Sequence, residues 1–74
     1  MTVREYLEKC IDRQEETVYA AKQNRKRSKG ISEKINASKH LEYERSKLYN
    51  YKQLNRDLPR IILNAEVQKG DVDI

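Results

Sequence analysis

Before Gly70, the sequence contains only one glycine, Gly30, and one proline, Pro59. Glycine and proline are the two residues that most disfavour helix interiors, so the long segments on either side of Gly30 can each form a helix. We predict helices at about 3–28 and 32–56. Two helices of this length joined by a short connection fold back on each other. The predicted fold class is therefore all-α, an antiparallel two-helix hairpin.

The first segment opens with a helix-capping signal. Thr2 and Glu5 have the spacing of a capping box, in which each side chain accepts a hydrogen bond from the backbone N–H of the other residue. Apolar residues then recur at spacings typical of one helix face: Val3, Leu7, Cys10, Ile11, Val18 and Ala21. Gln14 interrupts this stripe. Because the stripe ends at Ala21, residues 22–29 are expected to be helical but not packed.

The second segment also carries an apolar stripe. Gly30 suits the left-handed position that ends many helices, and Ser32 is the predicted N-cap of the second helix. The apolar positions that follow are Ile35, Ala37 or Ser38, Leu41, Leu48, Tyr51, Leu54 and Leu58. Glu44 and Arg45 place a polar turn where the apolar face is expected. Together with Gln14 they break the heptad pattern that a long coiled coil requires.

Pro59 is predicted to end the second helix, because it cannot donate a helical hydrogen bond. Residues 60–67 allow two interpretations, of which we favour a short third element that is a helix or an extended arm, because a lone strand has nothing to pair with in this chain. Their alternation of apolar and polar residues is typical of a strand, which would need the sheet edge of a partner or of a second copy. With a proline at the first position they also suit a short helix or an extended arm. The chain thus divides into a hairpin over 1–58 and a C-terminal element over 59–74, with 68–74 expected to be loose.

The chain is short of the apolar side chains that a large core needs. It has 74 residues, of which 36% are apolar, and it lacks Trp and Phe, whereas ordinary domains contain about 45–50% apolar residues. A bare hairpin also leaves one side of its apolar stripes open. We therefore expect the protein either to form a homodimer or to dock on a larger protein.

Side chains that support catalysis or metal binding are scarce. Cys10 is the single cysteine and His40 the single histidine, so they provide neither an internal disulfide nor a complete zinc site. In an antiparallel hairpin the two residues lie at different levels, and Cys10 falls on the apolar stripe. We expect a protein that is not an enzyme and that uses no metal or cofactor.

The sequence also shows no sign of membrane insertion. No apolar run approaches the roughly 20 residues of a membrane-spanning helix, and the first residues lack the apolar core of a signal peptide. These features predict a cytoplasmic protein that makes no membrane contact.

Positive charge is concentrated in residues 22–34, the basic tip. Its bases are Lys22, Arg25, Lys26, Arg27, Lys29 and Lys34, and its one acid is Glu33, which gives +5 in a chain of net charge +4. Such a tip can bind the phosphates of a nucleic acid or the acidic surface of a protein. Helix ends are also often basic because cations are favoured at the negative end of the helix dipole. No known nucleic-acid-reading motif accompanies the basic tip.

A second group of candidate contact residues lies on the second predicted helix: Tyr43, Arg45, Tyr49 and Lys52. Tyrosines interleaved with bases can stack on single-stranded nucleic acid. Tyrosine and arginine also supply much of the binding energy at protein interfaces, and a tyrosine at helical spacing is often a rim residue whose ring covers the core. These interpretations remain open.

The first nine residues, MTVREYLEK, resemble the start of small helical regulators encoded in prophages of Gram-positive bacteria. The resemblance implies a phage or mobile-element accessory protein and carries no site residues. We therefore expect a non-enzymatic accessory or inhibitor protein that occupies an acidic surface of a host macromolecule, with a host protein favoured. The alternative is a small nucleic-acid-binding regulator that uses the basic tip on phosphates.

Overall fold

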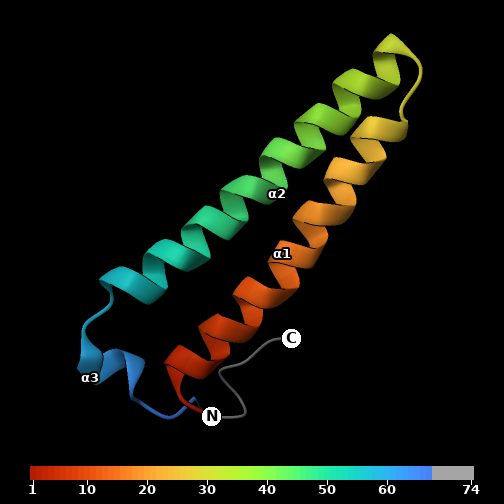
Figure 1. The fold of residues 1–74 in the computed structure, drawn as a ribbon. Coiled ribbons are helices and arrows are strands. Elements are labelled where there is room, and N and C mark those ends of the chain that lie inside the picture. Colours follow the sequence, from red (N-terminus) through yellow and green to blue (C-terminus); the bar gives the residue numbers. More distant parts are fainter. Residues whose placement is uncertain (68–74) are drawn as a thin grey trace.

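The computed structural model of the chain describes residues 1–67 and shows an all-α hairpin (Figure 1). Helix α1 spans Val3–Arg27, α2 spans Ile31–Asp57 and the short α3 spans Arg60–Leu63. Helices α1 and α2 lie side by side and antiparallel, and α3 lies at the end of the hairpin remote from the α1–α2 turn. The predicted fold class is confirmed, and each boundary of the two long helices differs by at most one residue from its predicted position.

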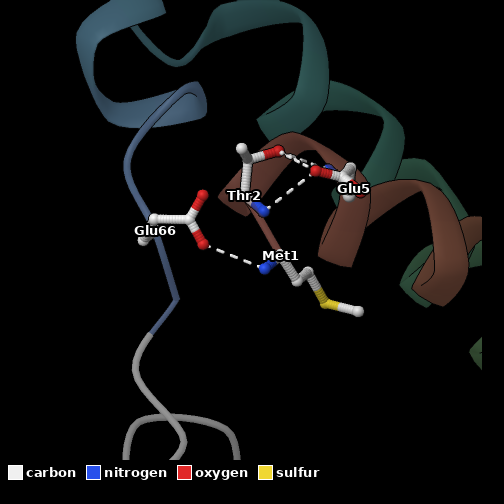
Figure 2. Close-up of polar contacts among 4 residues, drawn as sticks. All are labelled: Met1, Thr2, Glu5 and Glu66. Carbon is white, nitrogen blue, oxygen red and sulfur yellow. Dashed lines mark hydrogen bonds and ion pairs between the residues drawn. The ribbon is translucent and has the colours of Figure 1, made fainter.

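The start of α1 forms the predicted capping box. The Thr2 hydroxyl accepts a hydrogen bond from the Glu5 backbone N–H at 3.2 Å, and Glu5 Oε1 accepts one from the Thr2 backbone N–H at 3.1 Å (Figure 2). The backbone N–H and then the hydroxyl of Thr2 hold the pKa of the Glu5 carboxyl below its ordinary value of 4.5. The charged carboxylate therefore stabilises the folded chain.

A Glu5→Gln variant is expected to be less stable than the parent at pH 7, and by a smaller amount near pH 3. Glutamine keeps the geometry of the capping box but lacks the charge. Because folding lowers the pKa of Glu5, its contribution is present above the unfolded value and is lost as the pH falls through the folded value. Urea denaturation of both proteins at the two pH values measures this difference, and an equal gap at both would contradict the assignment.

The connection between α1 and α2 differs from the prediction. Gly30 is not left-handed: its φ is −87° and its ψ is 156°, and it serves as the N-cap of α2. The chain leaves α1 at Ser28 in an extended conformation, and the Ser28 N–H bonds to the carbonyl of Asn24 at 3.1 Å. Two extended residues reverse the chain, so no left-handed glycine is required. Ser32 is consequently inside the first turn of α2 and is not its N-cap.

The core is narrow because only two long helices face each other. Its buried apolar residues are Leu7, Val18, Ala21, Ala37, Leu41 and Leu63. Leu41 is the most deeply buried, at 2% exposure, and packs with Val18 and Ala21. Two residues of the predicted stripe on α2, Ile35 and Leu54, are 49% and 46% exposed. They lie too far around the helix to reach α1, so that part of the prediction is wrong.

Two of the three residues that break the apolar stripes, Gln14 and Glu44, face each other inside the hairpin. Gln14 and Glu44 are both buried, and the Gln14 Nε2 donates to the Glu44 backbone carbonyl at 2.9 Å and to the Glu44 carboxylate. The Lys47 ammonium lies 4.0 Å from the same carboxylate. Each interruption thus supplies the hydrogen-bond partner of the other, so neither polar group is buried unsatisfied.

The C-terminal element combines both interpretations of residues 60–67. The chain forms α3, which buries Leu63, and then runs antiparallel to the residues before α1. The Val3 N–H donates to the carbonyl of Ala65 and the Val67 N–H to that of Met1, both at 2.9 Å. The residues at the start of the chain therefore supply the backbone partner for which the strand interpretation required another chain. The expectation that an extended segment here has nothing to pair with in the same chain is wrong. Residues 68–74, predicted to be loose, lie outside the described residues.

A charged contact accompanies this pairing. The Met1 amine lies 2.9 Å from the Glu66 carboxylate (Figure 2). The hydrogen bond and the charge of Glu66 hold the pKa of this amine above its ordinary value of 8.0. The first turn of α1 is thus tied to the C-terminal element by backbone and side-chain contacts.

Candidate functional site

A basic groove runs between α1 and α2 near the turn. It has a volume of about 580 Å³ and is lined by Lys22, Arg25, Lys26, Lys34, Ser38, Leu41 and Arg45. Leu41 belongs to the core and lies at the floor, whereas the charged residues at the rim are exposed. Lysine and arginine expose their charged ends and cover apolar surface with their methylene stems. Because Leu41 is 2% exposed, the apolar surface of the groove comes mainly from these stems, and the charged ends form a positive rim.

Helix geometry explains why these side chains converge. Lys22, Arg25 and Lys26 are spaced by three and four residues and share one face of α1. On α2, Lys34 and Arg45 are eleven residues apart, close to three full turns, so they also share a face. The antiparallel packing places these two faces on the same side of the hairpin.

Among residues 1–67, no acidic residue lines the basic groove. The ion pairs within residues 1–67 are Met1–Glu66, Lys47–Glu44, Lys52–Glu15 and Arg56–Asp57, and none of them includes a base of the groove. Five positive charges thus meet without neutralisation by the described part of the chain. A polyanionic surface is the ligand that this arrangement favours.

The helix dipole accounts for only part of this charge. Arg25 and Lys26 lie in the last turn of α1, where cations are favoured. Lys34 lies near the start of α2, where the dipole disfavours a cation, and Arg45 lies in the middle of that helix. The helix dipole therefore does not account for the last two residues.

The remaining bases among the predicted contacts lie elsewhere. Arg27 and Lys29 are exposed but do not line the basic groove. Lys52 lies 3.8 Å from the Glu15 carboxylate on α1, which places it in an exposed cross-helix ion pair.

The predicted tyrosine contacts do not form a single platform. Tyr43 and Tyr49 are both exposed, and neither lines the basic groove. They are six positions apart, which turns their side chains about 120° apart around α2. The Lys47 ammonium lies 4.8 Å from the centre of the Tyr43 ring. A continuous row of rings for stacking nucleic-acid bases is therefore absent from this part of α2.

The other candidate chemistry has no assembled site in the described residues. Cys10 is half-buried and His40 is exposed. Within residues 1–67, no three His, Cys, Asp or Glu side chains come together in a way that could hold a metal ion. None of the helices in this range has both the length and the apolar character needed to cross a bilayer.

Five of the ten predicted contact residues meet in the basic groove, and five do not. Ser38 and Leu41 also line it, although the sequence suggested them only as members of the apolar stripe. Comparison of the chain with protein-family models, curated proteins and solved structures finds no match.

Proposed function

We propose that this chain is a non-enzymatic binding protein whose basic groove holds an acidic surface of a larger protein. The observation that carries the proposal is the convergence of five bases without an acidic partner on one groove. Bringing like charges together destabilises the free protein, and a polyanionic partner removes that repulsion.

The shape of the groove favours a protein partner. The methylene stems of the bases can cover apolar side chains of a partner while their charged ends meet carboxylates. An acidic helix or loop presents both kinds of group. The resemblance of residues 1–9 to prophage regulators supports the further proposal that the partner is a host protein and that the chain acts as an accessory or inhibitor by occupying its surface.

Nucleic acid is the second candidate partner. The observation that favours it is the set of five bases together with the Ser38 hydroxyl, all of which can contact phosphate oxygens. The separation of Tyr43 from Tyr49 around α2 weighs against recognition of single strands by stacking. In this alternative the groove bases contact the phosphate backbone of a duplex.

We expect a groove variant, Arg25→Ala with Lys26→Ala and Arg45→Ala, to bind an acidic probe at least about tenfold more weakly than the parent. The probes are fluorescent poly-L-glutamate and a fluorescent DNA duplex, each titrated at about 50 and 200 mM salt. The matched control is Arg27→Ala with Lys29→Ala and Lys39→Ala, which removes the same charge outside the groove. The control should bind poly-L-glutamate nearly as well as the parent.

Equal losses in the two triple variants would show that net charge governs binding and would overturn the role of the groove. The second candidate would be favoured by three results together. The duplex would bind more tightly than poly-L-glutamate, its binding would fall steeply with salt, and the groove variant would lose it. Circular dichroism of both variants confirms that the helices are intact.

A further inference from the structure

One exposed face of α1 carries a polarised stripe of side chains. Residues along it are separated alternately by four and three positions, which keeps them on one side of a helix. The members of this charged stripe are Glu8, Asp12, Glu15, Tyr19, Lys22 and Lys26, and all are exposed. Its N-terminal half is acidic and its C-terminal half is basic, with a tyrosine between them that is 65% exposed.

The charged stripe is complementary to itself in the antiparallel direction. When two copies of α1 lie antiparallel, the numbers of facing residues add to a constant. With a constant of 34, the stripe of one copy meets that of the other in three layers: Glu8 with Lys26, Asp12 with Lys22, and Glu15 with Tyr19. Each layer occurs twice because of the two-fold symmetry. A parallel pairing would instead place like charges together.

We propose that the charged stripe is a docking surface for a second copy of this chain, arranged antiparallel about a two-fold axis. The Glu8–Lys26 and Asp12–Lys22 layers form ion pairs across the interface, and the Tyr19 hydroxyl donates a hydrogen bond to Glu15 of the other copy. A hollow of about 630 Å³, lined by Asp12, Glu15, Glu16 and Tyr19, receives the side chains of the second copy.

The helix dipole alone does not explain this pattern. It favours acids in the first turn and bases in the last turn, whereas Asp12, Glu15 and Lys22 lie in the interior of α1. The dipole also gives no reason for these charged residues to lie on a single face of α1. Lys22 and Lys26 belong both to this surface and to the basic groove. Dimerisation and the binding of an acidic partner in the groove therefore compete for these two bases.

Sedimentation equilibrium on the full chain tests the proposal at about 50 and 500 mM salt. The parent should dimerise at low salt, and the dissociation constant should rise at least about tenfold at high salt, because exposed ion pairs are screened. The acid-reversed variant, Glu8→Lys with Asp12→Lys, and the base-reversed variant, Lys22→Glu with Lys26→Glu, should each be monomeric. An equimolar mixture of the two should form a heterodimer.

The matched control is Glu42→Lys with Asp57→Lys, two exposed positions on α2 that change the net charge as the acid-reversed variant does. It should dimerise as the parent does. A parent that stays monomeric at low salt would overturn the proposal. The proposal would also be overturned if either reversed variant alone still dimerised. It would be overturned as well if the two variants were folded but formed no heterodimer when mixed.

Discussion

A Gln14→Leu variant is expected to lose about 3 kcal/mol of unfolding free energy. Leucine has nearly the volume of glutamine, so packing is largely kept, but the amide that donates to Glu44 is removed. The buried carboxylate then keeps only the Lys47 ammonium, 4.0 Å away. Leaving a buried charged group without its hydrogen bond costs several kcal/mol. Chemical denaturation of the parent and the variant measures the loss.

The double variant Gln14→Leu with Glu44→Leu is the control for this prediction. Replacing both partners by apolar side chains removes the need for a hydrogen bond and is often neutral or stabilising. It should therefore recover most of the stability that the single change loses. If the double variant loses at least as much stability as the single variant, the two side chains do not act as a pair.

A Leu41→Ala variant is also expected to lose about 3 kcal/mol, within the range measured for buried leucines. Leu41 is 2% exposed and packs between Val18 and Ala21 at the centre of the narrow core. A small domain has a total stability of roughly 5–10 kcal/mol, so this single change removes a large fraction of it. Differential scanning calorimetry should show a melting temperature lower by about 15 °C.

Ile61→Ala provides the comparison, since Ile61 is 82% exposed on α3. Its loss should stay within about 0.5 kcal/mol. A large loss at Ile61 would show that the open side of α3 is covered in solution. A small loss at Leu41 would show that the hairpin core is not packed around that side chain.

The two long helices could be predicted because their signals are local. The Thr2–Glu5 box starts α1, and Gly30 and Pro59 mark the ends of two segments without breakers. The conformation of Gly30 could not be inferred in the same way. A hairpin turn can be closed by a left-handed glycine or by two extended residues, and the choice depends on how the helices pack.

Which residues of α1 lie opposite which residues of α2 could not be predicted directly from the sequence. In the sequence, Gln14 and Glu44 are polar residues that interrupt two separate apolar stripes. Only the alignment of α1 with α2 shows that they are hydrogen-bond partners. The same alignment decides that Arg45 joins Lys22 in the basic groove whereas Tyr43 does not. The eleven-residue spacing of Lys34 and Arg45 was the available signal for the α2 side of the groove.

The backbone pairing of residues 1–3 with residues 65–67 determines where anything joined to the chain must be attached. Both segments lie at one end of the hairpin, and the turn beside the basic groove lies at the other (Figure 1). The 25 residues of α1 separate the two ends, a distance of roughly 37 Å. A label, a surface anchor or a fused domain placed before residue 1 would therefore leave the groove open to a partner.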